Sequence, residues 1–262
     1  MRALIVVAAA VLAGISPCAA QDDAQEPRRD STLVHLDTAA VAGRAVWSGR
    51  LEVRAFGGDE DVVYTGLGLS YGLGNGWVAI ARGMLAERKD FALPGGGAIR
   101  HGGNDLEILA KYQSVRYPRL AGLVGVAFAD TAAQSDTFLT LGATASAELG
   151  ERATAYLNPR AVFIEDNTLV GIGLGVRARL TAHLDLVGDW TPLVAGDNTR
   201  DTTTGSTRRR DVFGVAVRYT APDGRYALDL GFANGTGHTT GAALTPGLGD
   251  SGAFYVALSA RW

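Results

Sequence analysis

Charged side chains recur at alternate positions along apolar stretches of this sequence. Between residues 168 and 180, Arg177 and Arg179 alternate with Val176 and Ala178. Because successive side chains of a β-strand point to opposite faces, this pattern predicts strands with one apolar and one charged face. Guanidinium and carboxylate groups gathered on one side of a sheet can pair with each other, or they can line a water-filled path for ions.

The predicted polar face carries both signs of charge, and arginine is its commonest residue. We expect an enclosed interior to be lined by Arg50, Glu52, Arg54, Glu107, Lys111, Asn158, Arg160, Arg177, Arg179, Asp185, Asp189, Arg218, Asp229 and Arg261. Two interpretations stay open. Either these groups pair across a narrow lumen and hold the structure together, or a remaining file of arginines favours the passage of anions.

The sequence contains no convincing pairing of a nucleophile with a base. The most plausible group, His238 with Thr239 and Asp250, consists of ordinary loop residue types. The acidic residues 59–61 are more typical of a solvated hairpin tip than of a calcium site. We therefore expect no catalytic residue, no metal and no cofactor, and we predict that the chain is not an enzyme.

A basic run closes one of the longer connections between apolar stretches. Arg208, Arg209 and Arg210 directly precede the stretch that begins at residue 211. Arginine forms strong charge-assisted hydrogen bonds to phosphate, so the run is a candidate contact for lipopolysaccharide. The alternative is a charged, solvated rim.

The residue pattern of the N-terminal region predicts that the protein is exported from the cytoplasm. Residues 1–20 have the form of a secretory signal peptide, with Arg2, an apolar core and small residues before a cleavage site near Ala20. Residues 21–46 are expected to be a leader on the periplasmic side or a short plug, although the segment from Ser31 could also begin the first strand early or form a short helix. Cys18 is the only cysteine, so cleavage leaves no disulfide.

The rest of the chain, residues 47–262, reads as a succession of strands and turns. The sequence has 35 glycines, 8 prolines and no second apolar run long enough for a membrane helix. We expect twelve strands, at approximately 47–56, 62–71, 77–84, 105–113, 120–128, 137–148, 153–164, 168–180, 184–192, 211–219, 226–232 and 252–262. The longer connections all fall at alternate gaps, as in an up-and-down meander with short turns at one end and long loops at the other. We expect the long loops 85–104, 193–210 and 233–251 to narrow the entrance.

The last stretch of the chain alternates most clearly. Phe254, Val256, Leu258 and Trp262 share one face, and an aromatic residue ends the sequence. This pattern resembles the C-terminal signature of bacterial outer-membrane β-barrels. The resemblance implies that these residues form a signal for the barrel-assembly machinery.

A narrower resemblance rests on short motifs. Leu109–Tyr112 (LAKY), Tyr117–Ala121 (YPRLA) and Tyr71–Leu73 (YGL) before Trp77 are similar to segments of predicted outer-membrane transporters linked to the degradation of aromatic compounds. No functional residue transfers from this likeness.

These observations predict an all-β fold, a single up-and-down antiparallel transmembrane barrel of about 12 strands in the outer membrane of a Gram-negative bacterium. We expect a passive channel or transporter for small solutes, with anions favoured if the arginine file is open. The alternative is a non-conducting structural or adhesive barrel whose lumen is closed by charge pairs. Membrane lipid and lipopolysaccharide are the expected surroundings, and the net charge of −3 argues against a nucleic-acid partner.

Overall fold

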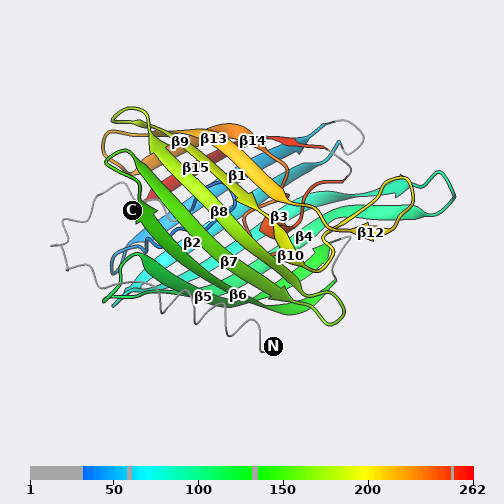
Figure 1. Cartoon of the computed structure of the whole chain (residues 1–262), viewed down its shortest axis with the longest axis horizontal. Helices are drawn as coiled ribbons and strands as arrows, with labels where there is room; N and C mark the ends of the chain where they lie inside the picture. The colour runs from blue at the N-terminus through cyan, green and yellow to red at the C-terminus, as the bar shows by residue number, and fades with distance from the viewer. Residues whose placement is uncertain (1–31, 58–60, 132–134, 249–250) are drawn as a thin grey trace.

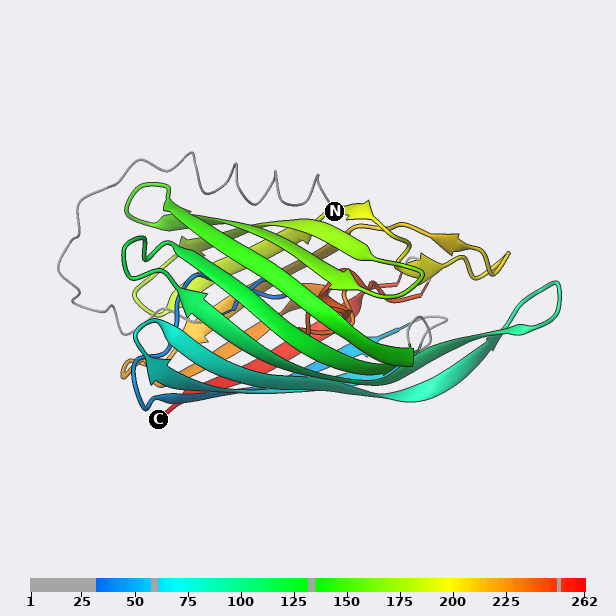
Figure 2. The same ribbon diagram turned by 90° about the horizontal axis from the view of Figure 1, so that it is seen from below.

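The chain folds into a closed antiparallel β-barrel whose strands are inclined to the barrel axis (Figures 1 and 2). The computed structural model describes residues 32–57, 61–131, 135–248 and 251–262. The wall strands are β1 (Trp47–Phe56), β2 (Val63–Gly74), β3 (Trp77–Ala92), β4 (Ala98–Gln113), β5 (Leu120–Thr131), β6 (Ser135–Glu148), β7 (Ala153–Phe163), β8 (Leu169–Arg179), β9 (Leu184–Thr191), β13 (Val212–Thr220), β14 (Tyr226–Ala233) and β15 (Ala253–Arg261).

Closure is provided by the first and last strands. β1 pairs with β15 in continuous register from Ser48 opposite Arg261 to Phe56 opposite Ala253. Each remaining wall strand pairs with its neighbours in sequence, including β8 with β9 and β9 with β13. No wall strand of the described chain is therefore left with an unpaired long edge, and the predicted single up-and-down barrel of twelve strands is confirmed.

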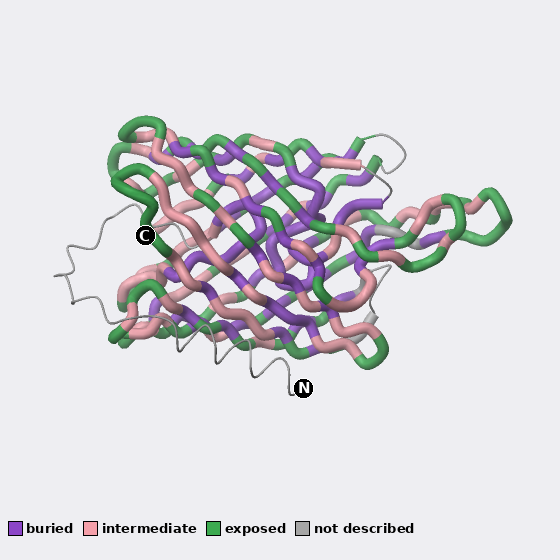
Figure 3. The backbone as a smooth tube through the Cα atoms, viewed as in Figure 1, coloured by how far each residue is buried: buried purple, intermediate pink, exposed green. Residues whose placement is uncertain are grey.

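Burial alternates along the wall (Figure 3), as the sequence pattern predicts. In β13 the apolar Phe213, Val215 and Val217 are exposed, whereas Arg218 between Val217 and Tyr219 is only 2% exposed. Aromatic rings gather on the outside at the end that carries the short turns, where the ring centroids of Trp47 and Tyr71 are 4.6 Å apart and those of Trp77 and Tyr112 are 4.8 Å apart. An apolar outer wall with aromatic rings near one end matches a bilayer and its interface.

The hairpin of β3 and β4 differs most from expectation. The segment 85–104, expected to be a long loop over the entrance, instead continues both strands and leaves only residues 93–97 as the connection, so the hairpin projects beyond the barrel (Figure 1). Its outer part contains charged residues on both faces, such as the adjacent Lys89 and Asp90. The backbone pairing of β3 with β4 continues through this outer part without an apolar face, so apolar alternation in the sequence could not predict the extra length of the two strands.

Shorter elements complete the connection from β9 to β13. β10 (Leu193–Ala195) pairs with β8, and β11 (Thr199–Arg200) forms a small hairpin with β12 (Thr207–Arg208). The tip of this hairpin lies against the β3–β4 arm, because a methyl group at Gly205 would be 2.7 Å from Leu93. A single turn of 3-10 helix, η1 (Ala242–Leu244), lies between β14 and β15. Across the described residues, no helix is long and apolar enough to cross a membrane.

Candidate functional site

Residues 32–40, which we call the inner segment, lie inside the barrel. They enter the lumen from the end at which β1 begins and β15 ends. Leu33, Val34 and Leu36 are each at most 1% exposed. The segment turns back on itself, since the amide of Leu33 donates to the carbonyl of Leu36 (2.7 Å) and Thr32 forms a β-bridge with Asp37. The sequence left open an early start of the first strand or a short helix in this region. Residues 32–40 form neither, because they contain only this turn and bridge and β1 begins at Trp47.

Glycines on the inner wall make room for the inner segment. A Cβ atom at Gly173 would lie 2.4 Å from a methyl carbon of Leu36, and one at Gly175 would lie 2.3 Å from a methyl carbon of Leu33. The same holds at Gly214 in β13, where a Cβ atom would lie 2.5 Å from a methyl carbon of Val34. Because these three glycines lack side chains, the inner wall has a groove at their positions, and the apolar side chains of the inner segment pack into it.

Wall side chains also bind the backbone of the inner segment. An irregular segment inside a barrel has no strand partner, so its buried carbonyls need other donors. These donors are largely residues that the sequence predicts on the polar face: Arg218 on the carbonyl of Thr32 (3.0 Å), Arg54 on Val34 (3.1 Å), Arg160 on His35 (3.0 Å), Asn158 on Asp37 (2.9 Å) and Lys111 on Ala40 (2.7 Å).

Two contacts with carboxylates reinforce this docking. His35 contacts Asp189 of β9 through both its backbone amide and its ring, each at 2.7 Å. Asp37 accepts two hydrogen bonds from Arg82 of β3 (3.2 and 3.3 Å), and Arg82 also donates to Glu107 (2.6 Å). Each contact joins a side chain of the inner segment to a wall strand, so the position of the segment is fixed by specific pairs as well as by packing.

The opposite half of the lumen holds a second segment, residues 234–248, which we call the inward loop. Thr240 donates its amide to Glu107 (2.9 Å), and Thr239 donates its hydroxyl to Asp105. The imidazole Nδ1 of His238 lies 3.0 Å from Glu52 Oε1. The connection expected to narrow the entrance therefore enters the barrel, where Figure 2 shows it between the walls in orange to red.

The two lumen segments meet at Arg54. Its Nη1 donates to the carbonyl of Gly235 in the inward loop (2.8 Å) and lies 2.5 Å from Nε2 of His35 in the inner segment. Its Nε donates to Glu52 (3.2 Å), which also faces His238. One fully buried guanidinium thus contacts both segments.

The remaining residues of the predicted polar face form smaller groups. Arg218 binds both oxygens of Asp229 (2.6 and 2.7 Å), and Arg50 reaches the same carboxylate (3.0 Å) and the hydroxyl of Tyr255. A separate group consists of Arg177 and Asp185 (2.7 Å), at the end of the barrel that carries the short turns. Arg179 and Arg261 are half-buried at the same end.

Several lumen residues escaped the sequence analysis. Arg82 follows Val78 and Ile80 at the same parity in β3, so extending that alternation would have found it. Tyr255 is fully buried, on the face opposite Phe254. His35 and Asp37 carry no periodic signal, because their segment is irregular.

The outer residues singled out from the sequence lie away from the lumen. Phe254, Leu258 and Trp262 are 58%, 49% and 62% exposed on the outer wall, and Val256 is half-buried beside them. Arg208 lies near Asp201 (3.4 Å), and Arg209 donates to the carbonyls of Gly196 and Val194.

The β11–β12 hairpin that precedes Arg209 and Arg210 is itself ordered by hydrogen bonds. The amides of Thr204 and Thr203 donate to Asp201 (2.9 Å each) and lower the pKa of its carboxyl group. Arg210 donates its amide to Asn198 (2.9 Å), so the backbone of the basic run is anchored to the start of the hairpin.

The structure also shows the surroundings of the residues that the sequence offered as weak catalytic or calcium-binding candidates, where these residues are described. His238 faces Glu52 rather than a nucleophile, and Asp250 lies outside the described residues. Asp59 and Glu60 lie outside them as well, whereas Asp61 is exposed beside Lys89. Within the described ranges, no three His, Cys, Asp or Glu side chains converge as metal ligands would.

Comparisons with known proteins agree with this architecture. No family model and no curated protein matches the sequence. Among solved structures, the COG4313 outer membrane channel from Pseudomonas putida F1 aligns with a TM-score of 0.53 at 12% identity, covering 92% of this chain and 100% of the other. The chain shares its fold with outer-membrane channels. The KdgM porin aligns with a TM-score of 0.50 at 10% identity, covering 82% of this chain and 98% of the porin. At these identities the likeness concerns the barrel alone.

Proposed function

We propose that this barrel is an outer-membrane channel or transporter for small solutes, and that the inner segment and the inward loop control passage through it. The observation that carries the proposal is the nature of what fills the lumen. Two connecting segments occupy it, and they are held by side-chain contacts rather than by strand pairing. Such segments can move while the hydrogen-bonded wall stays intact.

The charge of the lumen supports a bias toward anions. Arginine is frequent on the inner wall. Within the described residues, Arg160 donates to the carbonyl of His35 and to the amide oxygen of Asn158, and neither acceptor is a carboxylate. Displacement of the inner segment would free the guanidinium and ammonium groups that now bind its carbonyls. A path opened in this way would be lined by positive charge.

One competing function rests on the same contacts. The lumen acids contact cations, as Glu107 does with Arg82 (2.6 Å) and Asp229 with Arg218 (2.6 Å). Both lumen segments also bury apolar side chains. A non-conducting structural or adhesive barrel would need this kind of closed interior.

Planar-bilayer recording of the purified, folded chain separates the two functions. Discrete conductance steps are expected for a channel, and a reversal potential under a salt gradient should show preference for chloride over potassium. Folded protein that inserts without any steps would favour the closed structural barrel, and steps with cation preference would contradict the anion bias alone.

The membrane context completes the proposal. The short turns, the start of β1 and the end of β15 would face the periplasm after export directed by residues 1–20. Phe254, Val256, Leu258 and Trp262 would be read by the barrel-assembly machinery. Arg208, Arg209 and Arg210 would then lie near lipopolysaccharide phosphates. Replacing all three with Gln should reduce the lipopolysaccharide that copurifies with the barrel, and unchanged retention would contradict this contact.

A further inference from the structure

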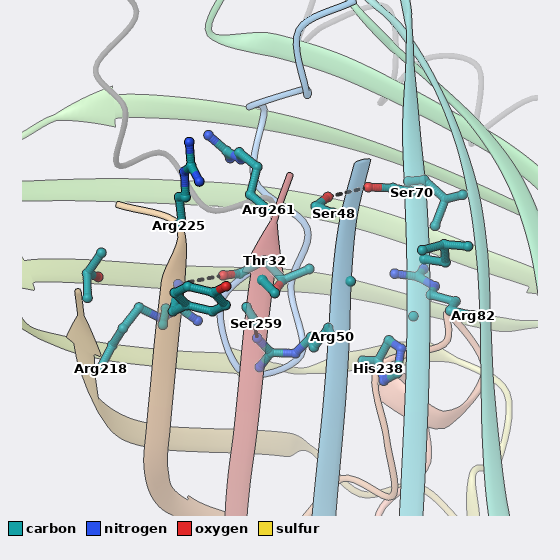
Figure 4. Close-up of a pocket in the computed structure, with 18 of the residues that line it drawn as sticks. Thr32, Ser48, Arg50, Ser70, Arg82, Arg218, Arg225, His238, Ser259 and Arg261 are labelled. Carbon is teal, nitrogen blue, oxygen red and sulfur yellow. Dashed lines mark hydrogen bonds between the residues drawn. The ribbon is translucent and has the colours of Figure 1, made fainter. Parts of the chain in front are cut away.

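A cavity of about 90 Å³ lies between the inner segment and the wall formed by β15, β1 and β2 (Figure 4). Its wall is built from small side chains, with Ser48 on β1, Gly68 and Ser70 on β2 and Ser259 on β15. The hydroxyls of Ser48 and Ser70 are hydrogen-bonded to each other (2.6 Å). The cavity is at the end of the barrel that carries the short turns.

Cationic groups surround this cavity from several strands. Arg50, Arg82 and Arg218 are buried beside it, and Arg225 and Arg261 stand nearer its mouth (Figure 4). Asp37 is the one carboxylate that lines it among the described residues, and it is already bound by Arg82. Arg50 and Arg218 are paired with Asp229, which is not among the residues that line the cavity. The space therefore favours an anion, and guanidinium groups suit a carboxylate in particular.

The buried imidazole of His238 indicates that a ligand in this cavity should also carry a hydrogen-bond donor. His238 lines the cavity and is 4% exposed, yet its Nε2 has no hydrogen-bond partner among the described residues. Nδ1 also forms no hydrogen bond within the described residues, but it lies 3.0 Å from Glu52 Oε1, and the nearby carboxylate favours a proton on Nδ1. In the neutral ring Nε2 is then an acceptor, and a buried acceptor without a partner requires a donor.

Gly68 leaves open the space in front of this nitrogen. A Cβ atom at Gly68 would lie 3.1 Å from Nε2 of His238, and its next nearest atoms would be 3.8 Å away. A donor group from a ligand could therefore reach Nε2 from the side of β2. Ile80 and Ala227 add a small apolar surface to the lining, which suits a methyl or methylene group.

We propose that this cavity binds a small hydroxycarboxylate, with the carboxylate held by the arginines and the hydroxyl donated to Nε2 of His238. The inference rests on the proposed transport of small anionic solutes and names their chemical class. The inward loop supplies His238 and the inner segment supplies Thr32 and Asp37, so the site is complete only when both lumen segments are in place.

Calorimetry on the folded, detergent-solubilised chain tests the site directly. The ligands are L-lactate, propionate, propane-1,2-diol and inorganic phosphate, so that hydroxyl and charge are removed one at a time. Lactate should bind at least 10-fold more tightly than propionate or the diol. Equal affinity for lactate and propionate would remove the role of His238, and binding of phosphate without lactate would overturn the ligand class.

Variants locate the binding within the barrel. Gly68→Val should lower lactate affinity at least 10-fold by filling the cavity, whereas Gly142→Ala on the inner face of β6 should leave it unchanged. His238→Leu should make lactate and propionate bind equally. If Gly68→Val does not fold, the mouth variant with Arg225→Gln and Arg261→Gln provides the same test through weakened carboxylate binding. Lactate binding that survives all these changes would overturn the site.

Conductance distinguishes this inference from the proposed channel. Binding without any conductance in bilayers would leave the site intact and refute the channel. Conductance without lactate binding would leave the channel intact and refute the site.

Discussion

Asp189 holds His35 at two points, accepting the backbone amide on Oδ2 and the ring Nδ1 on Oδ1, each at 2.7 Å. On the far side of the ring, Nε2 lies 2.5 Å from a guanidinium nitrogen of Arg54, which can only donate. Nδ1 must therefore carry the proton, and Nε2 accepts. The imidazole is neutral and of one tautomer in this arrangement, and it links β9 to β1 through the inner segment.

Replacing Asp189 with Asn should loosen the inner segment. The amide can accept only one of the two hydrogen bonds and presents a donor to the other, at a cost of about 1–3 kcal/mol for the unsatisfied group. The measurement is thiol labelling of Val34→Cys in a chain with a replaced leader, so that Cys18 is absent. We expect faster labelling and larger or more frequent conductance steps.

Asp185→Asn is the matched control, because Asp185 lies on the same strand and, within the described residues, its carboxylate is bound by Arg177. Its labelling rate should equal that of the parent. If the two variants label alike, the two-point contact does not hold the segment.

Gly175→Ala should displace the inner segment by a steric route. The added methyl group would meet Leu33 at 2.3 Å and Leu36 at 3.1 Å, whereas Gly142→Ala meets nothing closer than 3.5 Å. Overpacking of this kind costs about 1–3 kcal/mol. Labelling of Val34→Cys should rise in the first variant only, and a barrel that shows no difference between them would argue against the packed groove.

Arg54→Gln tests whether the inner segment and the inward loop are coupled. Arg54 contacts Val34, His35 and Gly235, so its loss should expose both segments at once. Labelling should accelerate at Val34→Cys and, in a second background, at Ala243→Cys in η1. Arg116→Gln, which removes an exposed arginine in the turn between β4 and β5, should change neither. Acceleration at one site alone would show that the segments move independently.

The sequence allowed the barrel wall to be predicted because one physical constraint acts on every wall strand. A residue such as Val217 faces lipid and its neighbour Arg218 faces the interior, so alternation reports both strand and face. The projecting part of β3 and β4 escapes this constraint, since water bathes both faces there. The backbone hydrogen bonds of this outer part do not require apolar residues at alternate positions, so its sequence has no apolar periodicity from which a strand could be predicted.

Alternation along the strands predicts which side chains face the interior, but it does not predict how those side chains are arranged. Alternation identifies Arg54 and Arg160 on the inner wall, yet it cannot show that both donate to carbonyls of the inner segment. That segment is irregular, and its seat depends on glycines at 173, 175 and 214, whose missing side chains carry no pattern of polarity. Contacts between distant segments decide the site, and local periodicity does not encode them.

The outer wall gives a prediction about stability in a bilayer. Val217 is 44% exposed midway along β13, opposite Leu230, where the wall is expected to face lipid tails. Val217→Arg should lower the free energy of unfolding by about 2–4 kcal/mol, the cost of an arginine near the bilayer midplane. Denaturant titration in lipid vesicles measures this loss. Val115→Arg is the control, because Val115 is 73% exposed in the turn between β4 and β5 and should stay in water. Equal stability of the two variants would mean that the face of β13 carrying Val217 does not contact hydrocarbon.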